Sequence, residues 1–137
     1  MDKLARRAWG EALALVGARY RLHGRNAEHG LDCVGLIACA YWRAGLRFSP
    51  LPDDYRLRGG AETRAGERLE RSGFAHTVHG EMRFGDVVLS DVGRGQQHLS
   101  IASPDAHIHA HAGLRRVVLT PGAPLGRIVG RWRHSGS

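Results

Sequence analysis

The first residue that could do chemistry is a cysteine that directly follows an aspartate at the start of an apolar run. The segment GLDCVGLIACAYWRAG covers residues 30–45 and holds both cysteines, Cys33 and Cys39. Asp32 is a helix-capping residue type, so the pattern places Cys33 in the first turn of a helix. Free N–H groups and the positive dipole end there stabilise a thiolate, so we expect a lowered pKa and a nucleophilic sulfur. Cys39, in mid-helix, we interpret as simply buried.

A thiolate nucleophile needs a base and a group that orients the base. Four of the nine histidines cluster in the part of the chain that has strand-like patterns: His98, His107, His109 and His111. The last three alternate, so on a strand they share one face. If SPDA closes a hairpin whose even-numbered loop is centred on Pro104 and Asp105, His98 shares that face, opposite His111 and diagonal to His109. Sheet geometry alone leaves either of these two histidines as the orienting group.

The same histidines have two other interpretations. Imidazole nitrogens suit metal ions, and HIHAH together with His98 offers several of them. No acidic residue follows Asp105, however, so a metal site would have to use histidines alone or include Cys33. We therefore expect no metal and no other cofactor. The alternating histidines could also be a solvated strand face.

The N-terminal segment has basic residues followed by an apolar stretch and so mimics a signal peptide. Glu11 interrupts that stretch, and the apolar residues have helical spacing with one apolar face. These residues are Leu4, Ala8, Trp9, Ala12, Leu15 and Val16. We expect the first helix of the fold here and no signal peptide. No run reaches the roughly 18 apolar residues of a membrane span, so we expect no membrane insertion.

The order of the remaining patterns predicts an α+β domain. A helix over residues 32–44 ends at Gly45, residues 46–60 are proline-rich and irregular, and residues 61–74 form a short charged helix. The expected anchors of the charged helix are Ala65, Leu69 and Phe74. From Phe84 the apolar period is that of strands, expected at residues 85–90, 97–103, 106–112, 115–120 and 126–134. Helices followed by strands favour N-terminal helices packed on an antiparallel sheet of about five strands.

Length and charge limit the number of domains and the class of partner. With 137 residues and 15.0 kDa, residues 1–137 are expected to form one domain. A net charge of +7 and a pI of about 10.6 favour anionic partners such as nucleic acid or cell-wall polymers. All basic residues except Lys3 are arginines, spread without a block, which is typical of codon bias. We therefore expect no nucleic-acid partner.

Taken together in order, these patterns resemble the NlpC-like cysteine peptidases, papain-like enzymes that cut the stem peptides of bacterial peptidoglycan. The family pattern has a tyrosine, a glycine-containing loop and a Gly-apolar-Asp-Cys-x-Gly-Leu box, matched here by Tyr20 and residues 30–36. A Gly-Asp pair that opens a strand is matched by FGDVVLS at residues 84–90. A histidine that begins a strand and an apolar-His-Ala triplet are matched at residues 98–102 and 108–110. The resemblance covers nearly the whole chain and implies a papain-like fold.

The resemblance implies a role for each chemical residue. Cys33 is then the nucleophile, His98 the general base and His109 the third member that orients His98, while His111 stays a possible alternative. An imidazolium–thiolate pair is expected, and attack of its sulfur on an amide carbonyl gives an acyl-enzyme that water hydrolyses.

The resemblance also implies how substrate is held. It gives Tyr20 and Asp32 an oxyanion or substrate-binding role, with the Tyr20 hydroxyl acting beside the Cys33 backbone N–H. The substrate is a peptidoglycan stem peptide, cut beside diaminopimelate. Arginines near the cleft could hold its carboxylates bidentately, but the sequence does not identify which ones.

Two departures from the usual pattern indicate one branch of this family. Val34 stands where serine is common, and GLRFSPLPDDY follows the cysteine helix at residues 45–55. Both resemble the branch found in phage tail tips and gene transfer agents. That branch implies synthesis in the bacterial cytoplasm and assembly with tail-tip or hub proteins. Two alternatives remain: a tail-tip structural subunit with little activity, and a papain-like amidase or acyltransferase.

Overall fold

Three helices and eight strands make up the described part of the chain. In the computed structural model the described residues are 3–46, 61–77, 80–93 and 96–134. The helices are α1 (Lys3–Leu15), α2 (Cys33–Ala44) and α3 (Ala61–Arg71). A small antiparallel pair, β1 (Arg25–Asn26) and β2 (Gly30–Leu31), lies between α1 and α2. No described helix has both the length and the apolar character needed to cross a membrane.

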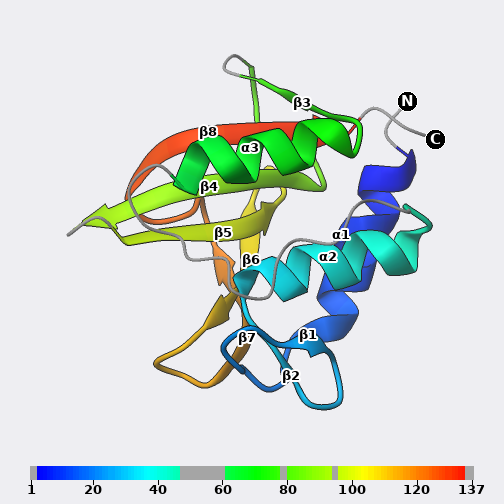
Figure 1. The fold of residues 1–137 in the computed structure, drawn as a ribbon, viewed down its shortest axis with the longest axis vertical. Coiled ribbons are helices and arrows are strands. Elements are labelled where there is room, and N and C mark those ends of the chain that lie inside the picture. Colours follow the sequence, from blue (N-terminus) through cyan, green and yellow to red (C-terminus); the bar gives the residue numbers. More distant parts are fainter. Residues whose placement is uncertain (1–2, 47–60, 78–79, 94–95, 135–137) are drawn as a thin grey trace.

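A six-stranded antiparallel sheet follows the helices, so the α+β prediction is confirmed (Figure 1). Its spatial order is β3 (Phe74–His76), β8 (Arg127–His134), β4 (Asp86–Gly93), β5 (Gln96–Ala102), β6 (Ala106–His111) and β7 (Arg116–Pro121). The strand of this sheet that sequence patterns missed is β3, which has only three residues; the two-residue strands β1 and β2 were expected to be loop. Phe74 was expected to anchor a helix, but Gly73 ends the turn after α3 with φ +96° and Phe74 pairs with His134 of β8.

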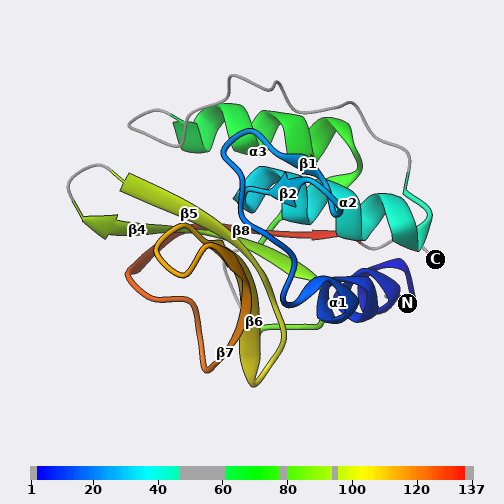
Figure 2. The same cartoon turned by 90° about the horizontal axis from the view of Figure 1, so that it is seen from below.

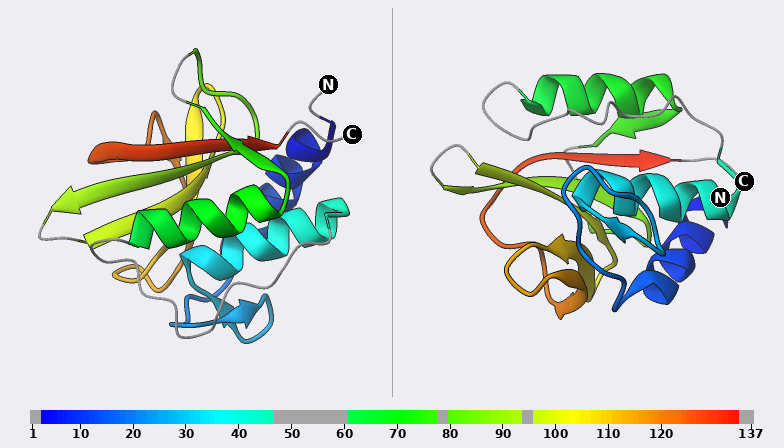
Figure 3. Two further views of the ribbon diagram at one scale, coloured as in Figure 1. Left: turned by 45° about the horizontal axis from the view of Figure 1, so that its top comes forward. Right: turned by 60° about the horizontal axis from the view of Figure 1, so that its bottom comes forward.

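The helices α2 and α3 cover the same face of the sheet, and α1 lies against α2 at the end of the sheet (Figures 2 and 3). The predicted stripe of α1 is buried except for Val16, which follows the helix and is exposed. The predicted cap residues of α2 are confirmed, because Asp32 caps its start and Gly45 ends it in a left-handed conformation. Leu69 is buried as predicted. The side chain of Ala65 and the irregular segment 47–60 lie outside the described residues.

Strand alternation separates apolar from polar side chains in the centre of the sheet. Leu99 and Ile101 of β5 are buried in the helix-side core together with Ile108 and Ala110 of β6. The intervening residues of both strands, including the histidines, therefore face the other side of the sheet. The predicted loop of the β5–β6 hairpin is confirmed, because Ala102 pairs with His107 and Ile101 with Ile108.

The Gly-Asp pair at the start of β4 has a structural explanation. Asp86 is fully buried and accepts two hydrogen bonds from the Arg133 guanidinium, at 2.9 and 2.8 Å, and one from the Arg83 N–H at 3.0 Å. Gly85 has φ +88°, and a Cβ there would lie 2.4 Å from the Ala5 carbonyl oxygen of α1. The Tyr41 hydroxyl of α2 donates to the Gly85 carbonyl. Gly85 and Asp86 therefore hold α1, α2 and β8 against the start of β4.

The glycine two residues after the cysteine also has a packing role. A Cβ on Gly35 would lie 1.9 Å from the Gly24 carbonyl oxygen, so the loop before β1 packs directly on the first turn of α2. This contact fixes the position of Cys33 relative to that loop.

We expect Gly35→Ala to lower the free energy of unfolding by about 1–3 kcal/mol, because backbone must move to admit the methyl group. Gly10→Ala is the matched control, because Gly10 lies in α1 and a Cβ there meets nothing within 4 Å. Gly10→Ala should raise stability by about 0.5–1 kcal/mol through helix propensity alone. Urea unfolding measures both, and equal effects of the two substitutions would contradict the packing role.

Candidate active site

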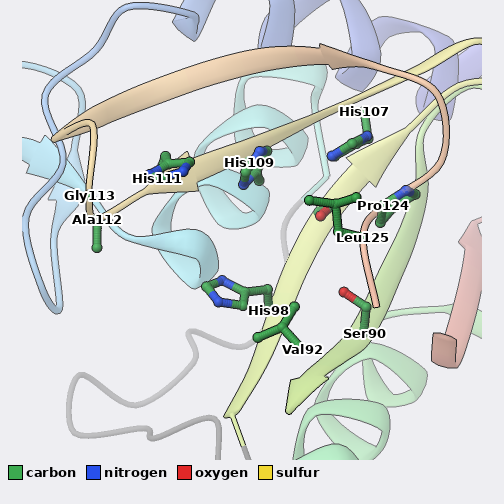
Figure 4. Close-up of a pocket in the computed structure, with 11 residues that line it drawn as sticks. Ser90, Val92, His98, His107, His109, His111, Ala112, Gly113, Pro124 and Leu125 are labelled. Atoms are coloured by element: carbon green, nitrogen blue, oxygen red, sulfur yellow. The ribbon is translucent and has the colours of Figure 1, made fainter. Parts of the chain in front are cut away.

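Cys33 is the first residue of α2 and lies against β5 where β6 diverges from it. The two strands pair only at Ile101 with Ile108 and at Ala102 with His107, although both continue beyond these residues. Figure 4 shows the two strands separating toward His98 and His111. A backbone hydrogen bond from Leu99 reaches the Cys33 sulfur in this opening. Because β6 does not pair with β5 at Leu99, the backbone of Leu99 is available to the Cys33 sulfur.

The predicted lowering of the Cys33 pKa is wrong in this structure. Burial raises the pKa of the thiol to about 12, and the neighbouring Asp32 carboxylate acts in the same direction. The backbone amides of Leu99 and Val34 and the charge of Arg25 favour the thiolate, but their effects are smaller. The helix start does stabilise the anion, but desolvation outweighs it because the sulfur is packed against the core.

Asp32 has the predicted capping role and also binds the loop before α2. Its buried carboxylate accepts hydrogen bonds from the Gly35 N–H at 2.8 Å and the His23 N–H at 2.9 Å. It also forms an ion pair with Arg25 at 2.8 Å. These contacts hold the start of α2 in place, and a role toward substrate stays a prediction.

Tyr20 lies close to Cys33, on the chain segment between α1 and β1. It forms a parallel bridge with Leu31, two residues before Cys33. Burial raises the pKa of Tyr20, and the nearby Cys33 and Asp32 raise it further. The structure therefore brings together three of the predicted site residues, Tyr20, Asp32 and Cys33.

The histidines line a cavity of about 260 Å³ on the sheet face opposite the helices (Figure 4). Its lining consists of Ser90, Val92, His98, Ser100, His107, His109, His111, Ala112, Gly113, Pro124 and Leu125. The predicted shared face of the histidines is therefore confirmed. His98 comes from β5 and the other three from β6, and the ladder ends before His98 and His111 would pair.

Cys33 and His98 are close because the backbone of the residue next to His98 contacts the Cys33 sulfur. The residue whose backbone binds the Cys33 sulfur, Leu99, directly follows His98 in β5. Among the described residues no hydrogen bond joins the thiol to the His98 ring. The two residues are therefore neighbours whose side chains are not hydrogen-bonded to each other.

The three rings of β6 form a row. His107 stacks on His109 with ring centroids 5.0 Å apart, and His109 meets His111 at 5.6 Å. Each ring has its own hydrogen bond: His107 Nδ1 to the Gly122 carbonyl at 2.9 Å, and His109 Nε2 with Thr120 Oγ1 at 3.4 Å. The Nδ1 atom of His111 accepts a hydrogen bond from the Leu114 backbone N–H at 3.0 Å.

Burial and mutual repulsion keep the central rings neutral. Desolvation lowers the pKa of His98, and His111 lowers it further. Desolvation also lowers the pKa of His109 to about 4, with added repulsion from His107, His111 and His98. At pH 7 His98 and His109 are therefore neutral imidazoles. Since the pKa of the thiol is raised, the expected imidazolium–thiolate pair is replaced in this structure by a neutral imidazole and a thiol.

Sequence patterns missed the side chains that bond to the histidine row. His107 was visible in the alternation of HIHAH, but its stacking on His109 was not. Thr120 gave no signal, because its place beside the histidines depends on the β6–β7 register, in which it pairs with His107. Across the described part of the chain, no three or more His, Cys, Asp or Glu side chains are arranged to hold a metal ion.

Comparisons with known proteins agree with this geometry. The model of the NlpC/P60 family matches residues 17–120. A Staphylococcus aureus structure described as similar to a lipoprotein of the NLP/P60 family has a TM-score of 0.67 at 18% identity over 100% of this chain. This chain spans only 43% of that protein. The P60 domain of an antigen from M. avium subspecies paratuberculosis has a TM-score of 0.65 at 16% identity, with 96% of this chain and 93% of that domain covered. No curated protein matches the sequence.

The raised pKa of Cys33 predicts slow alkylation at neutral pH. In a Cys39→Ala background, the rate with iodoacetamide should rise about tenfold per pH unit from pH 7 to 10, because the thiolate fraction still grows far below a pKa of about 12. A small free thiol is the control and levels off near a pKa of about 8.5. A plateau for Cys33 below pH 8 would show instead a thiolate formed in the resting protein.

Proposed function

Because the chain belongs to the NlpC/P60 family, we propose that it is a cysteine peptidase that hydrolyses peptidoglycan stem peptides. Members of this family are generally cysteine peptidases and typically hydrolyse the cell wall. The observation that carries the proposal is the position of Cys33, at a helix start and bound by the backbone of Leu99 beside His98. A histidine-lined cavity opens next to these residues.

Proton transfer accompanies nucleophilic attack in this proposal, because the resting thiol and imidazole are both neutral. His98 takes the proton of Cys33 as the sulfur bonds to the amide carbonyl carbon. The C–N bond then breaks, and His98 gives that proton to the leaving amine. A water molecule, deprotonated by the same ring, attacks the thioester, and its hydrolysis returns the thiol and releases the carboxylic acid.

The tetrahedral intermediate needs donors for its oxyanion. The backbone N–H of Cys33 lies in the first helical turn, where N–H groups have no partner within the helix. The hydroxyl of Tyr20 is the second proposed donor, since this residue is close enough to Cys33 for the two to affect each other's charge. The raised pKa of Tyr20 keeps the hydroxyl protonated and able to donate.

The hydrogen bonds of the histidine row favour His109 over His111 as the residue that orients His98. An orienting histidine must accept a hydrogen bond from the His98 N–H. His111 Nδ1 already accepts from Leu114, so its other nitrogen carries the proton and can only donate. If His109 Nε2–H donates to Thr120 Oγ1, its Nδ1 lone pair is left for His98. The low pKa of His109 keeps that lone pair available at neutral pH.

The finer parts of the proposal rest on the sequence resemblance. The bond cut is proposed to be the one beside diaminopimelate. We further propose that the protein is made in the bacterial cytoplasm and works at the tail tip of a phage or gene transfer agent with other tail proteins. Support comes from Val34, which is buried beside Cys33, and from the segment 45–55, of which residues 47–55 lie outside the described residues. A run of tail genes beside its gene would support this setting, and isolated cell-wall genes there would contradict it.

Hydrolysis by the isolated protein tests the central proposal. We expect release of muropeptide fragments from purified peptidoglycan, and loss of that release in Cys33→Ala because the nucleophile is removed. Cys39→Ala is the matched control and should keep full activity. Unchanged activity in Cys33→Ala would exclude the thiol mechanism. Inactive wild-type protein would favour the tail-tip structural subunit, and cleavage of acyl-ester substrates alone would favour an acyltransferase.

Two matched variants test the choice of orienting residue. His109→Ala should lower kcat/KM by on the order of 100-fold, because His98 loses the acceptor that holds its tautomer. His111→Ala should change kcat/KM by less than about threefold, since it removes only a partner of the Leu114 N–H. Steady-state kinetics on a stem peptide measure both. The reverse order of effects would assign the role to His111.

A further inference from the structure

Two arginines lie directly opposite each other at the edge of the sheet. Arg19, on the chain leaving α1, forms an antiparallel bridge with Arg116 of β7, and both side chains are exposed. The bridge is held by hydrogen bonds from the Tyr20 N–H to the Arg115 carbonyl at 2.9 Å and from the Val117 N–H to the Ala18 carbonyl at 2.8 Å. Like charges directly opposite on neighbouring strands destabilise a sheet. We call Arg19 and Arg116 the arginine pair.

No acidic group compensates the arginine pair within the described residues, where neither member forms an ion pair. Other arginines there do form ion pairs, among them Arg25, Arg127, Arg131 and Arg133. A like-charge pair that no described carboxylate neutralises fits a site for an anion from outside the chain.

The arginine pair shares a sheet face with the histidine cavity. The β6–β7 register pairs Arg116 with His111, and the side chains of paired residues lie on the same face. His111, Arg116 and Arg19 therefore form a row across three neighbouring chain segments. His111 lines the cavity together with Ala112 and Gly113, and this end of the cavity lies beside the chain that leaves α1 (Figure 4).

Along the chain, the arginine pair adjoins Tyr20, which lies close to Cys33. Arg19 directly precedes Tyr20, and the nearby Cys33 raises the pKa of Tyr20. Because His111 lines the cavity and pairs with Arg116, a substrate that occupies the cavity has the arginine pair at the His111 end. We propose that the arginine pair binds a carboxylate of the acidic stem peptide, a role that rests on the proposed peptidase function.

The chemistry of the arginine pair suits a carboxylate. Guanidinium groups bind carboxylates through two parallel hydrogen bonds, and two such groups from opposed strands can bind one carboxylate from both sides. Arg21 and Arg115 are exposed beside the pair and add positive charge. A polyanion such as DNA needs a basic stripe that follows many phosphates. Here the arginine pair lies in register with His111 at one end of a cavity of about 260 Å³, which favours a single carboxylate.

Steady-state kinetics with two substrates test this site. The substrates are a stem peptide with free carboxylates and the same peptide with those carboxylates amidated. For the free acid, Arg19→Gln with Arg116→Gln should raise KM about tenfold and leave kcat within about twofold. For the amide, the same double variant should leave KM unchanged. Arg43→Gln with Arg71→Gln is the matched control for lost charge, since both residues are exposed on α2 and α3. An unchanged KM for the acid, or an equal rise for both substrates, would overturn the proposal.

Binding to Cys33→Ala protein separates failure of this site from failure of the proposed function. If wild-type protein cuts neither peptide, the peptidase proposal fails, and calorimetry with the two peptides still tests the arginine pair. Preference for the free acid, lost on Arg19→Gln with Arg116→Gln, supports the site. Equal affinity for acid and amide overturns it. Loss of binding to duplex DNA or teichoic acid with an unchanged peptide preference would assign the pair to a polyanion and also overturn it.

Discussion

The candidate site depends on the early end of the β5–β6 ladder. After two residue pairs the strands separate, and the edge of β5 at Leu99 becomes available to a group from another element. The Cys33 sulfur, at the start of α2, lies within reach of that edge, where the backbone N–H of Leu99, next to His98, favours the thiolate. Asp32 and Gly35 fix the start of α2 against its preceding loop. A continuous ladder would occupy the Leu99 backbone and exclude the sulfur, so the irregularity creates the site.

Burial affects the protonation of both the thiol and the histidines at this site. Packing against the core keeps Cys33 a thiol, although a helix start and two backbone amides favour the thiolate. The same desolvation, together with neighbouring rings, keeps His98 and His109 uncharged and thus able to accept protons. The pair is therefore suited to general-base catalysis that begins when substrate is bound. A resting ion pair would need a more polar surrounding than this core provides.

Sequence patterns correctly predicted those features of the fold that depend on neighbouring residues. The caps of α2, the apolar stripe of α1, the hairpin loop at Pro104 and the shared face of the histidines all depend on a few adjacent residues, and all are confirmed. The short strand β3 was missed because three residues give no period, and its pairing with β8 spans about half of the chain. The predicted lowering of the Cys33 pKa was wrong because the desolvation of the thiol depends on tertiary packing. The positions of Thr120 and of the opposed arginines depend on strand registers that no local pattern contains.

The central claim is that Cys33 forms a covalent bond to substrate with His98 as the base. Acid-quenched mass spectrometry of the protein during turnover of a stem peptide tests this claim directly. The tryptic peptide of residues 26–43 contains both cysteines, so it is fragmented to locate the adduct. The account predicts a thioester on Cys33, with the mass of the acyl fragment on the N-terminal side of diaminopimelate, and its absence in His98→Ala. Product release with no adduct on Cys33, or an adduct on Cys39, would contradict the account.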